Sequence, residues 1–147
     1  CCRHVKIHNV FLRNSDDCIA LYNHRWWYWG GSSDFDISRA TLWCDWAHPV
    51  NIGTHGDDRS ETGETLENVR IHDCDILFHV GDGMLTIGCG DKNTIRDVTY
   101  DSIRIEDVPK AAFEMRVDYS EKYNRAPGNR VENVRFRNIS VTAPEGN

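Results

Sequence analysis

The stretch Val69-Arg-Ile-His-Asp-Cys-Asp-Ile76 contains two short runs of alternating apolar and polar residues, separated by Asp73. Alternation with a period of two is typical of short β-strands that bury one face. The same pattern returns in four other segments, which are Val5–Leu12, Phe35–Leu42, Val98–Ile105 and Val134–Val141. In all five segments the second run begins five residues after the first, which indicates a repeated structural unit.

A third short run follows each of the first four segments. These runs are Ile19–Leu21, Val50–Ile52, Leu85–Ile87 and Phe113–Met115. No part of the chain sustains the i, i+3, i+4 spacing of an amphipathic helix, and Val, Ile and Thr are concentrated in the strand positions. We therefore predict an all-β fold, in which residues 1–147 form one right-handed parallel β-helix of about five coils. The handedness follows from the general preference of crossover connections.

Equivalent positions of successive coils stack in a parallel β-helix, so the repeat also predicts the core and the corners. One inward file is expected to contain Val5, Phe35, Val69, Val98 and Val134, and another Val10, Ala40, Cys74, Ile103 and Ile139. Most corner residues are Asn or Asp, which tolerate a left-handed backbone and are expected to form side-chain ladders. The corner positions are His4, Asn9, Asp34, Arg39, Asn68, Asp73, Asp97, Ser102, Asn133 and Asn138.

Charge and composition exclude several kinds of partner. Lys and Arg number 17 against 23 Asp and Glu, a net charge of −6, so the chain has no basic field that would bind nucleic acid. No apolar run approaches the roughly 18 residues that span a bilayer, and no membrane partner is expected. The spacing of cysteines, histidines and acids fits no familiar ligand pattern, so we expect neither a metal nor another cofactor.

Neither end of the chain carries an amphipathic helix that would cap a solenoid. The chain is therefore expected to be a segment of a longer β-helix, or to associate end to end through its uncapped coils. The first residues contain neither a start Met nor an apolar signal stretch, which indicates a cut N-terminus. Six cysteines without a CxxC pair favour an oxidising compartment, and a secreted or periplasmic location is expected.

The strongest candidates for chemistry precede the third runs of the first two coils. Asp16 and Asp17 come shortly before Ile19, and His48 stands two residues before Val50, as Asp17 does before Ile19. Equivalent positions of neighbouring coils lie about 4.8 Å apart, so Asp17 and His48 are expected to be neighbours. Two carboxylates beside an imidazole are typical of glycosidases, whereas a polar corner turn is an equally good interpretation of the Asp pair alone.

Further substrate contacts are predicted on the outward face of the downstream coils. The alternation places Asn51, Thr86, Glu114 and Arg116 there, where they would line a groove along the coil axis. For Arg116 the alternatives are a contact with an acidic sugar and an ion pair with Glu114 or Asp118.

A loop of consecutive aromatic residues, Trp26-Trp27-Tyr28-Trp29, comes after the third run of the first coil. Aromatic faces bind the C–H faces of sugars, so Trp26, Trp27 and Trp29 are candidate substrate-binding residues that overhang the groove. Packing of these rings on their own coil is the alternative.

The run Asn14-Ser-Asp16-Asp17-Cys18-Ile-Ala, with His48-Pro-Val-Asn-Ile-Gly53 beginning 31 residues after Asp17, resembles two signatures of polygalacturonases. These signatures are Asp-Asp-Cys and Gly-His-Gly-x-x-Ile-Gly, and the enzymes belong to glycoside hydrolase family 28. They are extracellular, degrade pectin and have a right-handed parallel β-helix. The resemblance covers about residues 5 to 90, and Leu42-Trp-Cys-Asp-Trp-Ala-His-Pro49 is also similar to dextranase-like hydrolases of the same clan, which act on neutral glucans.

The resemblance implies roles for individual residues. Asp16 would be the general acid that protonates the leaving oxygen, and Asp17 would help to activate water, normally together with a third Asp about one coil earlier. His48 would keep the acid protonated or orient the sugar. The resemblance also implies a disulfide between Cys18 and Cys44.

Three features depart from the family pattern. The third Asp falls before the first residue of this chain. The Arg-Ile-Lys motif that holds the substrate carboxylate in the family would fall at Thr86-Ile87-Gly88, and Ala47 and Pro49 replace the two glycines around the His.

Together these residues predict an inverting, endo-acting polysaccharide hydrolase of the pectin-degrading, polygalacturonase-like type, or a truncated form that is inactive alone. Its expected partner is a polysaccharide. The alternative is a non-catalytic β-helix that binds glycans or serves as a scaffold, and a calcium-dependent lyase of the same fold is a third hypothesis.

Overall fold

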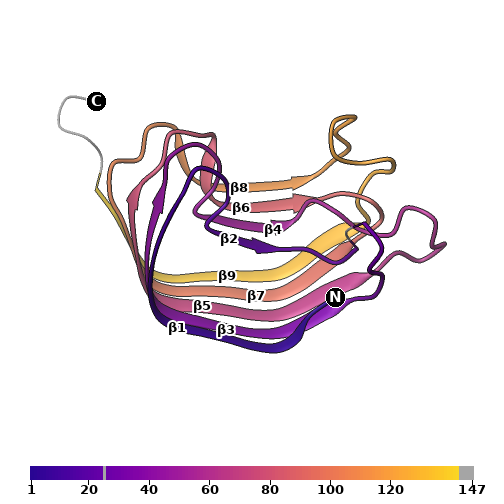
Figure 1. Cartoon of the computed structure of the whole chain (residues 1–147), viewed down its shortest axis with the longest axis horizontal. Coiled ribbons are helices and arrows are strands. Elements are labelled where there is room, and N and C mark those ends of the chain that lie inside the picture. Colours follow the sequence, from indigo (N-terminus) through magenta and orange to yellow (C-terminus); the bar gives the residue numbers. More distant parts are fainter. Residues whose placement is uncertain (25, 143–147) are drawn as a thin grey trace.

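The computed structural model describes residues 1–24 and 26–142, which contain nine β-strands arranged in two sheets. The strands are β1 (Arg3–Asn14), β2 (Ile19–Leu21), β3 (Ser32–Cys44), β4 (Val50–Gly53), β5 (Thr65–Phe78), β6 (Gly83–Cys89), β7 (Thr94–Ile105), β8 (Ala111–Val117) and β9 (Arg130–Val141). The large sheet has the order β1-β3-β5-β7-β9, and the small sheet has the order β2-β4-β6-β8 (Figure 1). None of these residues forms a helix long and apolar enough to cross a membrane.

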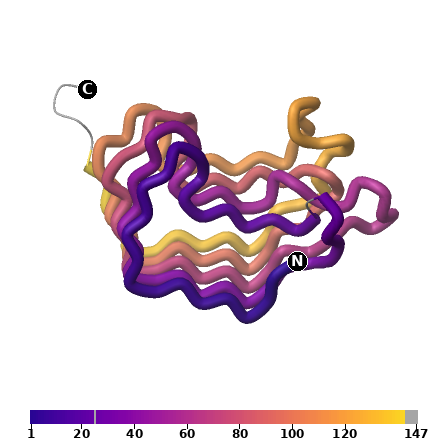
Figure 2. Tube along the Cα trace, in the orientation of Figure 1, coloured from indigo at the N-terminus to yellow at the C-terminus, as the bar shows by residue number. Residues whose placement is uncertain are grey.

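All strand pairings within the two sheets are parallel. Each of the first four coils contributes one strand to each sheet, and the last contributes β9 to the large sheet. This winding confirms the predicted right-handed parallel β-helix, with about four turns where the repeat predicts about five. The tubes of successive coils follow one another closely in Figure 2. The third runs pair as the repeat predicts, with Ala20, Asn51 and Thr86 aligned across β2, β4 and β6.

The first two runs of each repeat form one bent strand, so each coil has two strands and not the expected three. In β5 the bend lies at Asp73, whose φ is 53°. The ladder continues through the bend, since His72 pairs with Asp101 and Cys74 with Ile103. A left-handed residue therefore turns the chain without ending the strand, and the bend recurs in each coil of the large sheet (Figure 2).

The predicted corner residues adopt the left-handed backbone. All ten have φ between 50° and 63°. Side chains connect the corners of neighbouring coils, since Asn68 Nδ2 donates to Asp34 Oδ1 at 2.5 Å and Arg39 Nε donates to Asn9 Oδ1 at 2.6 Å. Such contacts recur at the first kind of corner, and among the described residues of the second kind the contact between corner residues is that of Arg39 with Asn9, so the predicted ladder is formed in part.

The core lies between the two sheets and contains both predicted inward files. Their inner members are at most 5% exposed and are Phe35, Val69, Val98, Ala40, Cys74 and Ile103. The members on the terminal coils are half-buried, because a neighbouring coil covers them on one side only. The alternation also predicts an inward Met115, which is instead 49% exposed because β8 pairs on one side only in the described chain. End-to-end association of these coils stays a prediction.

The core predicts the cost of a cavity in a middle coil. Ile71 is 1% exposed, and truncation in Ile71→Ala removes packing from the coils on both sides. We expect the free energy of unfolding to fall by about 2–5 kcal/mol, measured by equilibrium urea unfolding. Arg70→Ala, at the exposed neighbouring position, is the control and should change it by less than about 0.5 kcal/mol. Equal losses in the two variants would contradict the assigned inward face.

Candidate active site

Two connections that enter the small sheet bring the predicted catalytic residues together. Asp16 and Asp17 lie between β1 and β2, and His48 lies between β3 and β4. The two connections are in register, since the Cys18 N–H donates to the His48 carbonyl oxygen at 3.0 Å and the His48 N–H donates to Asp17 Oδ1 at 3.0 Å. Asp16, Asp17 and His48 all line one cavity of about 300 Å³.

The Asp17 carboxylate is held by the protein on both of its oxygens. Oδ1 accepts the His48 N–H, and Oδ2 accepts the Tyr22 hydroxyl at 2.9 Å and Asn51 Nδ2 at 2.8 Å. Asn51 Nδ2 also lies 3.3 Å from the Tyr22 oxygen. Three donors therefore fix the orientation of this carboxylate at the wall of the cavity.

Asp16 is exposed and much less constrained. Its Oδ1 accepts the backbone N–H of Asp17 at 2.8 Å. Its second oxygen has no hydrogen bond with any residue that the structure describes. A carboxyl group placed this way can exchange a proton with a bound ligand without breaking the turn.

The His48 ring is anchored through one nitrogen. Nδ1 donates to the Gly83 carbonyl oxygen at 2.8 Å and lies 3.2 Å from Thr86 Oγ1, and the Thr86 hydroxyl donates to the same carbonyl at 3.1 Å. These contacts assign the proton to Nδ1. Nε2 has no hydrogen-bond partner within residues 1–24 and 26–142, and it is available to a ligand.

Two of the four predicted groove residues support the catalytic candidates and are not open contacts. Asn51 is 7% exposed and holds Asp17, while Thr86 is 4% exposed and holds the His48 ring, although both line the cavity. Their outward position on a narrow sheet places them beneath the loops, which explains the burial.

The other two predicted groove residues form an ion pair. Arg116 Nε lies 2.9 Å from Glu114 Oε1 and 3.6 Å from Asp118 Oδ2. Arg116 lines the cavity that contains Asp16, Asp17 and His48, whereas Glu114 is outside its lining. For Arg116 the structure therefore contains the ion pair that the sequence left as one of two alternatives.

Tyr22 is a site residue that the sequence pattern did not predict. It comes directly after β2 and donates to Asp17 from the outward side. The alternation that places Ala20 outward also places Tyr22 outward, so the pattern contained the signal. The apolar alternation ends at Leu21, and the tyrosine therefore fell outside the predicted strand.

The three predicted tryptophans line a second cavity, of about 490 Å³. His55 and Tyr123 line both cavities, so the two are adjacent. The Trp29 ring stacks on His24 with centroids 4.7 Å apart and an interplanar angle of 14°, and the Arg59 guanidinium lies 4.4 Å from the Trp29 centroid. Trp29 therefore packs on protein groups, as one alternative predicts, while Trp26 and Trp27 are 70% and 82% exposed and their binding of a sugar stays a prediction.

The model of glycosyl hydrolases family 28 matches residues 1–146. The chain belongs to this family. A polygalacturonase of Fusarium fujikuroi is 21% identical over 145 residues, which are 95% of this chain and 35% of that protein. A polygalacturonase of Cochliobolus carbonum is 26% identical over 117 residues, covering 78% and 28%. A probable endopolygalacturonase B of Aspergillus niger is 22% identical over 143 residues, covering 93% and 35%.

This family 28 chain thus spans about a third of the length of the curated relatives it matches. No solved structure matches it.

The disulfide that the resemblance implies is absent from the structure of this family 28 chain. Cys18 and Cys44 are free thiols that contact each other next to the turn that contains Asp16 and Asp17. Their hydrogen bond raises the pKa of Cys18 and lowers that of Cys44, because one thiol donates to the sulfur of the other. The Cys18 sulfur also lies 3.3 Å from the Trp43 carbonyl oxygen, and the Cys44 sulfur 3.6 Å from that of Asp16.

Metal ligands do not gather anywhere in the described part of this family 28 chain. Among residues 1–24 and 26–142, no three His, Cys, Asp or Glu side chains are placed to hold one ion.

The different environments of the two aspartates predict different effects on stability. Asp17→Ala leaves the Tyr22 hydroxyl, the Asn51 amide and the His48 N–H without their acceptor. We expect the free energy of unfolding to fall by about 1–3 kcal/mol in urea titrations. The exposed Asp16→Ala should cost less than about 1 kcal/mol, because it removes one hydrogen bond. A larger loss for Asp16 than for Asp17 would contradict this placement.

Proposed function

We propose that this chain is the catalytic part of an inverting, endo-acting polysaccharide hydrolase of the pectin-degrading type. One observation carries the proposal, which is that Asp16, Asp17 and His48 line one open cavity from two adjacent coils. Membership of family 28 and the polygalacturonase names of the relatives support the substrate class.

In the proposed reaction Asp16 is the general acid. As the glycosidic C–O bond breaks, its proton moves to the leaving oxygen, and water attacks the anomeric carbon from the opposite face. The water gives its proton to a carboxylate base, with Asp17 contributing to its activation. Inverting enzymes separate acid and base by about 6.5–9.5 Å to admit this water. The open oxygen of Asp16 and the fixed orientation of Asp17 support this division of roles.

His48 would act through its open Nε2. The ring cannot rotate without losing its contacts with Gly83 and Thr86, so Nε2 keeps one direction. A neutral imidazole held this way orients a sugar hydroxyl or the acid proton and is not itself consumed.

A non-catalytic, glycan-binding β-helix is the second candidate. The observation that favours it is the tight hydrogen bonding of Asp17, because a carboxylate with three donors can serve a purely structural turn. The absence of basic side chains at Thr86 and Gly88 also weakens the contact with a galacturonate at the cleaved bond.

Hydrolysis distinguishes the two candidates. In the full-length product of the gene that encodes this chain, we expect Asp16→Asn to lower reducing-sugar release from polygalacturonate, or another pectic or neutral glucan substrate, by about 10²–10⁴-fold. Asp17→Asn should be similarly severe and His48→Ala milder. Glu106→Gln, an exposed carboxyl outside the cavity, is the matched control and should retain full activity. Full activity of Asp16→Asn with an intact fold would refute the role of Asp16 as the general acid, and no hydrolysis by the unsubstituted full-length protein would leave the binding role.

We further propose that Cys18 and Cys44 are bonded in the natural protein, which would act in an oxidising location outside the cytoplasm. The contact between the two thiols supports this pairing, since adjacent coils already bring the sulfurs together.

Peptide mapping under non-reducing conditions tests the bond. Protein from an oxidising host should give one linked peptide pair containing Cys18 and Cys44, while the buried Cys74 and Cys89 stay thiols and serve as the control. Alkylation of Cys18 and Cys44 as free thiols in that protein would refute the bond.

A further inference from the structure

The cavity beside the catalytic one is the larger of the two and is built from loops of several coils. We refer to it as the tryptophan pocket, and the residues that matter here are Trp26, Trp27, Trp29, Arg59 and Arg125. It measures about 490 Å³ against about 300 Å³ for the catalytic cavity. Since the two cavities share lining residues, a ligand of several linked rings can occupy both.

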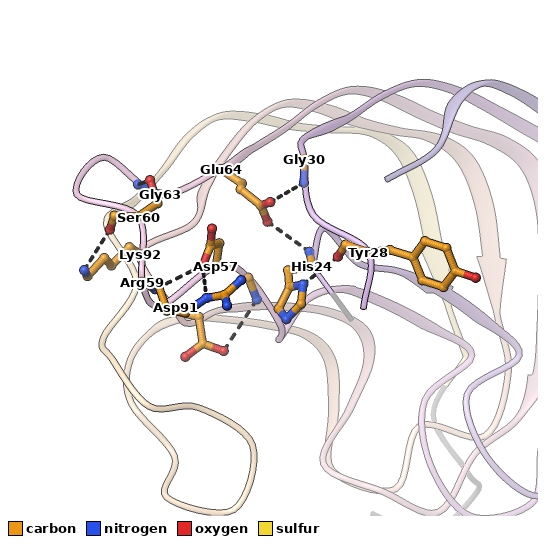
Figure 3. A network of polar contacts seen from close by, with 11 residues as sticks. His24, Tyr28, Gly30, Asp57, Arg59, Ser60, Gly63, Glu64, Asp91 and Lys92 are labelled. Atoms are coloured by element: carbon orange, nitrogen blue, oxygen red, sulfur yellow. Dashed lines mark hydrogen bonds and ion pairs between the residues drawn. The ribbon is translucent and has the colours of Figure 1, made fainter. Parts of the chain in front are cut away.

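The aromatic wall of the pocket is pinned at both ends. The Glu64 carboxylate accepts the His24 N–H at 2.9 Å and the Gly30 N–H, and Figure 3 shows it between these two backbone groups. Within the loop, His24 Nδ1 lies 2.5 Å from the Tyr28 carbonyl oxygen. A large exposed aromatic surface on a loop held this way is pre-organised for a ligand, because little further ordering is needed on binding.

The second wall presents a positioned guanidinium group. Asp57 Oδ1 accepts the Arg59 backbone N–H at 3.0 Å and Arg59 Nε at 3.4 Å (Figure 3). The Arg59 guanidinium also lies against the Trp29 ring, which is supported in turn by His24. Lys92 Nζ donates to the Ser60 carbonyl oxygen at 2.8 Å and anchors the same loop. Arg59 is nevertheless 63% exposed, so its remaining donors are accessible.

The third wall adds a guanidinium that has no partner among the described residues. The Arg125 backbone N–H donates to Asp91 Oδ1 at 2.7 Å, and Asp91 Oδ2 accepts Asn124 Nδ2 at 3.2 Å, so this buried carboxylate is occupied by the loop itself. The Arg125 side chain is exposed and has no ion pair or hydrogen bond with any described residue. Asp58 is the remaining carboxylate in the lining.

We propose that the tryptophan pocket binds an anionic sugar unit of the polysaccharide, with the sugar carboxylate on Arg59 and Arg125 and a ring face on Trp27. The proposal rests on the proposed function, since it assigns a second subsite to the same substrate. Guanidinium groups bind carboxylates through paired N–H donors, and indole faces bind the C–H faces of sugars.

The catalytic cavity has fewer basic groups that could bind a sugar carboxylate than the tryptophan pocket has. Arg116 is the single Arg or Lys in its described lining, and Glu114 and Asp118 neutralise it. The guanidinium groups that would bind a carboxylate therefore lie beside a neighbouring sugar unit and not beside the bond that is cleaved. Such a site selects a chain that carries an acidic unit in the tryptophan pocket and tolerates a neutral unit at the cleaved bond.

Binding to two probes that differ only in charge tests the proposal. The probes are a galacturonate oligosaccharide and its fully methyl-esterified form, titrated calorimetrically into the full-length protein carrying Asp16→Asn, so that neither is consumed. We expect the acid to bind about 10-fold more tightly than the ester. Arg125→Gln and Arg59→Gln should each reduce this ratio several-fold, and the double variant should bring it close to one.

Two further variants separate charge recognition from stacking and from a general charge effect. Trp27→Ala should weaken both probes by a similar factor, because the ring face does not sense the carboxylate. Arg135→Gln, at an exposed position on β9 of the large sheet, is the matched control and should leave the ratio unchanged. Equal binding of acid and ester by the parent protein, or an unchanged ratio in the Arg59 and Arg125 double variant, would overturn the proposal.

Failure of this proposal and failure of the hydrolase have different signatures. If the unsubstituted full-length protein releases no reducing sugar while the charge ratio depends on Arg59 and Arg125, the hydrolase falls and the subsite stands. If hydrolysis depends on Asp16 while the ratio ignores both arginines, the subsite falls and the hydrolase stands.

Discussion

Parallel hydrogen bonding between equivalent residues of successive coils is the constraint on which the rest of this structure depends. Val5, Phe35, Val69, Val98 and Val134 follow one another across the large sheet, and each inner member buries its side chain against the next. A slip by one residue would turn every inward side chain outward. The corner residues preserve the register, because a left-handed residue turns the strand while the ladder continues on both sides of it.

The same register assembles the candidate active site. Asp17 and His48 are 31 positions apart in the chain, yet they are neighbours because each precedes the small-sheet strand of its own coil. Asn51 and Thr86 occupy successive outward positions and support Asp17 and His48 respectively. The scaffold therefore supplies both the candidate catalytic groups and the side chains that orient them, which leaves the exposed Asp16 as the most accessible of the carboxyl groups.

Charge is distributed unevenly along the groove. At the candidate active site Arg116 is paired with two acids. At the tryptophan pocket Arg59 pairs with Asp57 and lies on the Trp29 ring, while Arg125 has no ion pair with a described residue. This difference is the physical basis for proposing bond-breaking chemistry at one cavity and recognition of charge at the other. The proposed subsite would also be a counterpart to the basic side chains that the family pattern has where this chain has Thr86 and Gly88.

Strict periodicity in the sequence by itself determined the coil and its stacking. The inward files, the ten left-handed corners and the meeting of Asp16, Asp17 and His48 all result from equal spacing, because in-register coils stack equivalent residues. Tertiary structure alone decided the fusion of two runs into one bent strand, the burial of Asn51 and Thr86, and the second cavity. Arg59 and Arg125 belong to loops of different coils that share no period. Their approach to the tryptophans depends on contacts such as that of Glu64 with the ends of the aromatic loop, which no repeat in the sequence encodes.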